Sequence, residues 1–335
     1  MAWCSYQTKQ TGIFSDGALP IIGRPVYGCQ HDGHREAIFR NCLRCDDFTS
    51  SSAKPAGHPK RHPPNVFCDR YGNHAPLADL YRGAGCFLIL AGPSLKELPL
   101  ELLKKRGVIT MTINNGVAAF PEGVRPHLWT FTDKPQKFHD SIWKDPGILK
   151  FCSTRLWERQ LDTRDGLEFK PLGLKPSEMP GTFYYARNTE FDPDAWLFEP
   201  SINRGNGKKG HAKNGLPRTI NTMFTAVRIL FYLGFSRVYL CGCDFRMETD
   251  AVYAFDETKH AGGCRSNNSA YANMNTMFDM LVPSFQKAAF EVINVTPRSL
   301  CNSFPRGDFT EAIERETHHI EQEMNTNGWY NHTPD

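Results

Sequence analysis

The chain has no long apolar run and no large excess of charge. None of its apolar segments approaches the roughly 20 residues that a membrane-spanning helix needs, and its first residues, MAWCSYQTKQ, lack the regions of a signal peptide. The formal net charge of the 335 residues is only +3, so charge alone does not indicate a nucleic-acid-binding protein. We therefore expect a cytoplasmic protein without a transmembrane segment. Its 11 cysteines are then thiols or metal ligands rather than disulfides.

Internal repeats and long low-complexity tracts are also missing, but the composition changes along the chain. Residues 1–50 are rich in Cys and His, and residues 51–76 form a linker of Ser, Pro, Gly and basic residues. From 77 to 325 apolar runs alternate with helical patterns, which predicts an α/β fold with a Rossmann-like, doubly wound, mostly parallel sheet. Residues 326–335 are a polar tail. The expected strands are 87–91, 108–113, 128–132, 149–153, 183–186, 238–243 and 290–295, and the expected helices are 95–105, 137–144, 219–233, 269–289 and 310–325.

The Cys/His-rich segment predicts a structural zinc site. Cys42 and Cys45 form a C-x-x-C pair, and Cys29 with His34 or His31 supplies two further donors for a tetrahedral ion. A segment with so little apolar core needs such a staple. A chain without metal, carrying incidental thiols, is the alternative. Four protein ligands would close the site, which favours a role in folding or docking over catalysis.

The turn after the first expected strand is the strongest motif of the second region. Phe87–Leu90 is apolar and runs into Ala91, Gly92, Pro93 and Ser94. We expect Ser94 to cap a helix over 95–105, with Glu97 completing a capping box. The turn has neither a Walker A sequence nor the three-glycine dinucleotide fingerprint. Its position still favours phosphate binding at the carboxyl end of a strand.

Polar residues follow several of the other expected strands. Because the carboxyl ends of parallel strands share one edge of a sheet, these residues are candidates for one site. Each also has a purely structural interpretation as a turn or cap residue. The candidates for nucleotide binding are Asn114, Asn115, Thr219, Asn221, Thr222 and Gly242, and the candidate acidic residues are Asp133 and Asp244.

Two polar, glycine-containing segments are expected to be loops. Residues 204–213 carry four cationic side chains and three glycines, which suits a loop that closes over phosphate. Residues 256–268 form a second candidate loop, and His260 on it is the candidate general base. Ordinary solvated loops are the alternative for both.

Taken in order, AGPSLK, the Asn114 turn and the Thr219–Phe235 helix followed by VYLCGCDF resemble the bacterial lipo-oligosaccharide sialyltransferases. The layout is also similar to Rossmann-like proteins that include the 6-hydroxymethylpterin diphosphokinases. The resemblance covers roughly residues 84–300. It implies that Gly92, Pro93 and Ser94 line a nucleotide-phosphate site, and that Asn114 and Thr222 contact the nucleotide of a CMP-activated sugar.

The chain departs from the sialyltransferase pattern: the C-terminal membrane-associating segment of some members is not evident, and the N-terminal Cys/His module is not part of the family pattern. Two further departures concern the site. The Asn of the family's first turn is missing here. Arg265 stands at the position of the family's general-base His, and His260, five residues before it in the sequence, is the candidate substitute. The leading hypothesis is a glycosyltransferase that uses a CMP- or UDP-activated sugar, with a nucleic acid as one candidate acceptor bound through the N-terminal module. The alternatives are a pterin-type diphosphokinase, with Asp133 and Asp244 holding the Mg²⁺ of ATP, and a non-catalytic nucleic-acid-binding protein.

Overall fold

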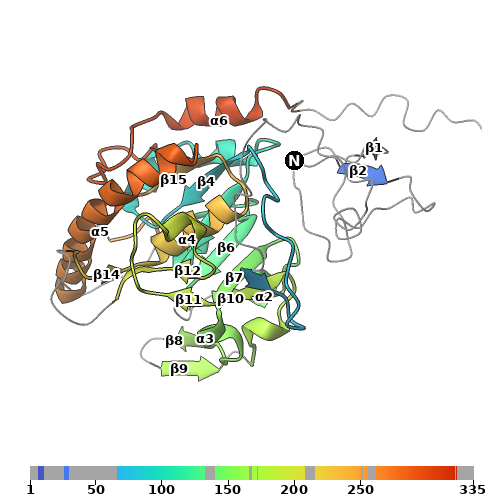
Figure 1. Ribbon diagram of the computed structural model, residues 1–335, viewed down its shortest axis with the longest axis horizontal. Helices are drawn as coiled ribbons and strands as arrows, with labels where there is room; N and C mark the ends of the chain where they lie inside the picture. Colours follow the sequence, from blue (N-terminus) through green and yellow to red (C-terminus); the bar gives the residue numbers. More distant parts are fainter. Residues whose placement is uncertain are drawn as a thin grey trace, which may run out of the picture.

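The structure is a computed structural model. Most of it is a mixed α/β domain with one large sheet (Figure 1). The residues that it describes are 7–10, 26–29, 66–132, 140–165, 168–171, 173–207, 216–249, 252–255, 261–320 and 322. Eight strands form the sheet in the order β16-β15-β4-β5-β6-β7-β10-β3. All neighbours are parallel except β3 and β10. This arrangement confirms the expected mostly parallel sheet.

All seven expected strands are present in the sheet, and each differs from its expected range by at most a few residues. Their apolar, β-branched and aromatic runs are buried on both faces, as strands of a parallel sheet require. The eighth strand, β3, was not expected. The strands are β3 (Phe67–Cys68), β4 (Gly85–Ile89), β5 (Thr110–Ile113), β6 (Leu128–Phe131), β7 (Leu149–Ser153), β10 (Thr182–Tyr185), β15 (Arg237–Cys241) and β16 (Glu291–Asn294).

Residues 66–76 pack with the sheet, although the sequence placed them in the linker. Strand β3 pairs with β10, and Phe67 is fully buried between Phe151 and Tyr232. An aromatic side chain of this size stabilises the fold by burial, which a solvated linker would forgo. The part of the chain that packs with the sheet therefore begins before residue 77.

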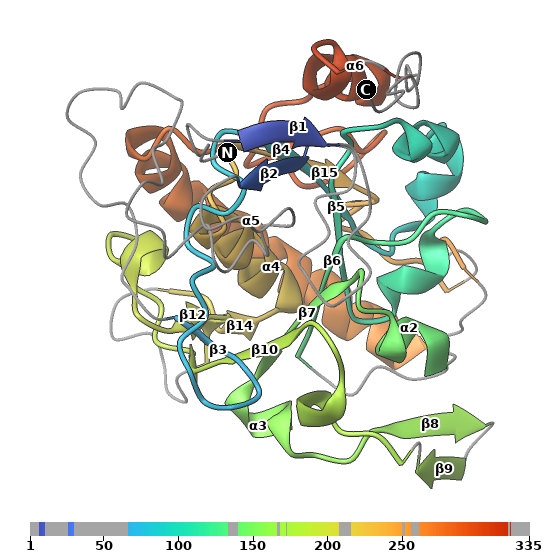
Figure 2. The same cartoon turned by 90° about the vertical axis from the view of Figure 1, so that its right-hand side faces the viewer.

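Helices cover both faces of the sheet, as a doubly wound fold requires. In β4, Cys86 and Leu88 pack in the cluster that contains α4 and α5, whereas Phe87 and Ile89 pack in the cluster that contains α6. Figures 1 and 2 show the two groups of helices around the strands. The α-helices are α2 (Asp140–Lys144), α3 (Thr154–Trp157), α4 (Thr222–Tyr232), α5 (Ala261–Lys287) and α6 (Phe309–Thr317).

Short elements complete the described chain. Four two-stranded pairs lie outside the main sheet, and several turns are 3-10 helices. The pairs are β1 (Gln7–Gln10) with β2 (Val26–Cys29), β8 (Asp162–Asp165) with β9 (Glu168–Pro171), β11 (Arg187–Asn188) with β12 (Ile202–Asn203), and β13 (Gly205–Asn206) with β14 (Thr219–Ile220). The 3-10 helices are Pro93–Glu97, Leu100–Lys104, Asn114–Ala119, Pro176–Glu178 and Trp196–Phe198.

The prediction of one helix over 95–105 is wrong. Two 3-10 helices take its place, because Pro99 interrupts the stretch and holds Leu98 in an extended conformation (φ −91°, ψ 141°). The expected capping box is also absent: Gly92 is the N-cap residue and no side chain caps the turn. Glu97 instead forms an ion pair with Arg298.

The loop expected over 256–268 is wrong in its second half, because α5 begins at Ala261. Polar residues there resemble a loop in sequence, but their side chains serve a tertiary contact. The Asn268 side chain accepts from the Met247 N–H (2.8 Å) and donates to the Met247 carbonyl (3.0 Å), and Cys264 packs on Met247 and Val252. Arg265 lies on this helix and is exposed.

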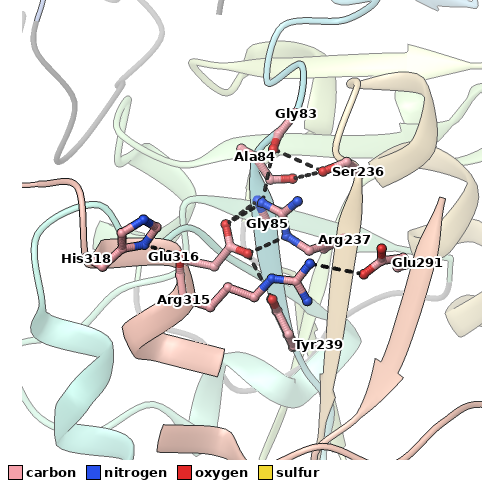
Figure 3. Close-up of polar contacts among 10 residues, drawn as sticks. All are labelled: Gly83, Ala84, Gly85, Ser236, Arg237, Tyr239, Glu291, Arg315, Glu316 and His318. Carbon is pink, nitrogen blue, oxygen red and sulfur yellow. Dashed lines mark hydrogen bonds and ion pairs between the residues drawn. The ribbon is translucent and has the colours of Figure 1, made fainter. Parts of the chain in front are cut away.

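A buried carboxylate fixes α6 to the amino-terminal edge of the sheet (Figure 3). Glu316 accepts hydrogen bonds from the Gly85 N–H (2.9 Å), the Arg237 Nε (2.6 Å) and the Tyr239 hydroxyl (2.9 Å). Burial alone would raise the pKa of Glu316, but Arg237 and the other donors together lower it. Gly85 leaves the room that this carboxylate fills, because a Cβ there would lie 2.3 Å from Glu316 Cδ.

Candidate functional site at the switch point of the sheet

The order of the strands creates a crevice beside β4. From β4 the chain adds β5, β6, β7 and β10 on one side and then returns with β15 and β16 on the other side. Segments that follow β4 and β15 therefore diverge at their carboxyl ends, which is where open α/β sheets bind ligands. A cavity of about 470 Å³ lies at this point, within the range usual for sites of small ligands.

Residues after β4, β5 and β15 line this cavity together with residues from α4 and α5. Most of the predicted site residues are among them: Gly92, Asn114, Asn115, Asn221, Thr222, Gly242 and Asp244. Three predicted residues lie outside the lining: Pro93, Ser94 and Thr219. Thr219 is in β14, which pairs with β13, rather than in the first turn of α4.

The turn after β4 supports an acidic side chain. The Ser94 hydroxyl donates to Asp244 Oδ2 (2.7 Å) and is buried. A Cβ at Gly92 would lie 1.9 Å from the same oxygen, so only glycine leaves room for this carboxylate. The Gly92 N–H donates to the Gly242 carbonyl (3.0 Å), and Pro93 has no N–H. The turn therefore supports the Asp244 side chain and does not present a set of free N–H donors to a ligand.

Asp244 is a buried carboxylate in the lining of the cavity, with an exposed fraction of 5%. Burial raises the pKa of Asp244, while the Ser94 hydroxyl and N–H and the charge of Arg246 oppose that rise. The other charged residues of the lining are Arg204 and Arg246. The lining thus carries two cations and one carboxylate, and Glu248, which does not line the cavity, lies 4.0 Å from the Arg246 Nε and partly balances its charge.

Asn114 joins three segments at the edge of the cavity. Its φ of +43° is unusual for a residue other than glycine. Asn114 Nδ2 donates to Thr222 Oγ1 (3.0 Å), and its Oδ1 accepts from the Thr132 N–H (3.3 Å). The Thr132 and Thr222 hydroxyls lie 2.5 Å apart. The Asn114 side-chain amide has two N–H donors and two acceptor lone pairs, and this network uses one of each, so the other two can bind a ligand.

Aromatic side chains form a second part of the lining that the sequence analysis did not identify. Phe245 stacks on Tyr271 (5.1 Å between centroids, 15° between planes), and Tyr253 stacks on Phe255 (5.3 Å, 2°). Asn267 and Tyr271 on α5, four residues apart, both face the cavity. The spacing of Asn267 and Tyr271 could have indicated a shared helix face. The expected helix started at residue 269, however, and so left Asn267 out.

Several predicted residues lie outside the described residues. These are Asp133, His260 and three of the four predicted zinc ligands, namely His34, Cys42 and Cys45; Cys29 ends β2, and its side chain is not described. Within the described part of the chain, no group of three or more His, Cys, Asp and Glu side chains is placed to hold a metal ion. No helix in that part is both long and apolar enough to cross a bilayer.

Comparison with solved structures finds the sialyltransferase CST-II in two complexes. The complex with a trisaccharide acceptor and CMP has a TM-score of 0.35 and 16% identity, covering 66% of this chain and 85% of that chain. A variant with CMP has a TM-score of 0.38 and 17% identity, covering 71% and 90%. No protein-family model and no curated protein matches the chain. At these TM-scores the likeness carries no weight for function, which rests on the geometry of the site.

Proposed function

We propose that the cavity binds the nucleotide of a nucleotide-activated sugar and that the protein transfers the sugar to an acceptor. The observation that supports this is the convergence of strand-end polar residues, two arginines and aromatic faces on one cavity at the switch point of the sheet. A nucleotide combines an anionic phosphate with a flat base, and the lining offers partners for both.

The chemistry assigned to each group follows from its type. Arg204 and Arg246 are permanently charged and can stabilise the negative charge that develops on a nucleotide leaving group. Aromatic side chains such as Tyr253 and Tyr271 offer faces on which a base can stack. Asp244 is the described residue that can accept a proton or a hydrogen bond from a sugar hydroxyl.

The diphosphokinase alternative has less support. It needs a set of carboxylates for Mg²⁺, and Asp244 is the only carboxylate among the described residues that line the cavity. In the proposed function the reacting hydroxyl of the acceptor enters the cavity beside Asp244, and the rest of the acceptor contacts other residues. The Cys/His-rich residues 1–50 are one candidate for those contacts, and a nucleic acid is one acceptor class to test.

The proposal is tested by thermal unfolding and calorimetry with CMP, UDP and ATP, each with and without Mg²⁺. We expect CMP or UDP to stabilise the protein without metal, by about 2.7 kcal/mol at a hundredfold excess over Kd. Stabilisation by ATP that requires Mg²⁺ would favour the kinase, and no response to any nucleotide would refute the nucleotide site.

A matched pair of variants locates the binding. Arg246→Gln removes a cation from the cavity and should weaken nucleotide binding about tenfold or more, since hydrogen bonds to charged groups contribute about 1.5–3 kcal/mol. Arg298→Gln removes an exposed cation that pairs with Glu97, away from the cavity, and should leave affinity unchanged. Equal losses in both would show an unspecific charge effect instead of a site. Release of free nucleotide from the activated sugar then reports transfer or hydrolysis.

A further inference from the structure

Cys68 and His74 form a thiol–imidazole pair at the other side of the fold. Cys68 Sγ lies 3.7 Å from His74 Nδ1. A tetrahedral zinc ion with Zn–S of about 2.3 Å and Zn–N of about 2.0–2.1 Å holds its sulfur and nitrogen donors about 3.6 Å apart. This separation is that of a thiol–imidazole hydrogen bond, and it is also close to the separation of two donors on one ion.

The backbone fixes this spacing. Cys68 ends β3, which pairs with β10, and an antiparallel bridge joins Cys68 to His74 across a tight turn. Within the turn Asp69 Oδ1 accepts from the N–H groups of Tyr71 (2.9 Å) and Asn73 (3.0 Å). Donors held on a hydrogen-bonded hairpin lose little freedom on binding, which is what a metal site requires.

The surroundings suit a cation. His74 is exposed and Cys68 is half-buried, so an ion can reach both donors from solvent. The turn carries one charge of each sign, on Asp69 and Arg70, and the Tyr184 hydroxyl on the paired strand β10 faces Cys68. Thiolate and imidazole together favour zinc and similar soft divalent ions over Mg²⁺ or Ca²⁺.

We propose that Cys68 and His74 bind a zinc-class divalent ion, with water in the remaining positions. On binding, the Cys68 thiol releases its proton to solvent and its sulfur forms the metal bond, while His74 coordinates through the neutral Nδ1. Binding therefore strengthens as the pH rises, because the thiol must lose its proton. The site is separate from the cavity and does not depend on the proposed function.

The test measures alkylation of Cys68 by iodoacetamide in the full chain, resolved by mass spectrometry, with and without added zinc chloride. We expect zinc to slow the reaction of Cys68 at least tenfold, and His74→Ala to remove that protection. Cys86 and Cys152, which are fully buried, serve as internal controls for folding. Added Co²⁺ should give a thiolate-to-cobalt charge-transfer band that Cys68→Ser reduces.

Equal alkylation of Cys68 with and without zinc would overturn the proposal and leave a simple hydrogen bond between thiol and imidazole. Protection that persists in His74→Ala would overturn it as well, because the second donor would then be irrelevant. Unfolding in either variant is detected by rapid alkylation of Cys86 and Cys152. In that case the zinc dependence of Cys68 alkylation in the wild-type protein decides.

Discussion

Asp244 is the residue whose environment is most unusual in the cavity. Burial favours its neutral form, and the Ser94 hydroxyl opposes this by donating to the carboxylate. Gly92 is required beneath it for steric reasons alone, since its φ of −67° is open to any residue. A buried carboxylate whose pKa is raised, and whose hydrogen-bond donors oppose that rise, is suited to a proton-accepting role.

We predict that Asp244→Asn lowers turnover of the activated sugar about a hundredfold, the usual contribution of a general base. Wild-type activity should fall in acid as Asp244 is protonated, and this acidic limb should disappear in the variant. Ser94→Ala removes a donor that stabilises the carboxylate, so it raises the pKa of Asp244 further and moves the limb to higher pH. The pH profile of kcat/KM measures both changes. An unmoved limb in Ser94→Ala would assign it to another group.

Glu316 is the residue with the clearest structural role. Glu316→Gln removes the counter-charge of Arg237 and leaves one of its donors facing an amide NH₂ group. We expect the free energy of unfolding to fall by about 3 kcal/mol at pH 7, as for other broken buried pairs. Glu314→Gln, an exposed change on the same helix, is the control and should be nearly neutral.

The pH dependence of this effect has a defined sign. Because the folded-state pKa of Glu316 is lowered, its contribution is present above the unfolded pKa of about 4.3 and is lost as the pH falls through the folded pKa. The difference in the free energy of unfolding between wild type and Glu316→Gln should therefore become smaller in acid. A difference that stays constant from pH 7 to acid, in denaturant unfolding, would contradict the charge argument.

At the scale of elements, strands were easier to predict than helices. Buried parallel strands such as β7 are marked by continuous apolar runs between turn residues. The helix expected over 95–105 was wrong because the prediction relied on the spacing of apolar residues and neglected Pro99, which interrupts a helix. The start of α5 was missed because Ser266, Asn267 and Asn268 have low helix propensity, which contacts with Met247 override.

The amino end of α4 is a cap and part of the cavity at once. Asn221 Oδ1 accepts from the Met223 N–H (2.8 Å), and Asn221 also lines the cavity. We predict that Asn221→Ala lowers the free energy of unfolding by about 1 kcal/mol through loss of the cap. Asn221→Ser keeps a capping oxygen and should retain most of the stability. Denaturant unfolding of the three proteins checks this, and equal stabilities for Ala and Asn would show that the cap contributes nothing.

At the scale of the whole molecule, the sequence predicted seven of the eight strands of the main sheet but not how they are ordered. The residues after β4, β5 and β15 were expected to meet because parallel strands share an edge, and the cavity brings most of them together. Tyr253 could not be placed there, because it lies in an irregular segment whose packing no local pattern encodes, whereas Tyr271 was missed because Asn267, its neighbour on the same face of α5, was assigned to a loop. Ser94 was expected to face a ligand but faces Asp244, a contact across 150 residues of sequence that no local pattern encodes.

The N-terminal region carries the remaining prediction, one structural zinc ion held by Cys29, His34, Cys42 and Cys45. Four protein donors would bind zinc tightly enough to survive purification without added metal, unlike the two-donor pair at Cys68 and His74. Elemental analysis should therefore find about one zinc per chain, and Cys42→Ser should lose it. Cys68→Ser, the matched control, should retain this zinc, because Cys68 is not among the four predicted ligands. Loss of the purified zinc in Cys68→Ser but not in Cys42→Ser would show that the N-terminal set has been assigned to the wrong residues.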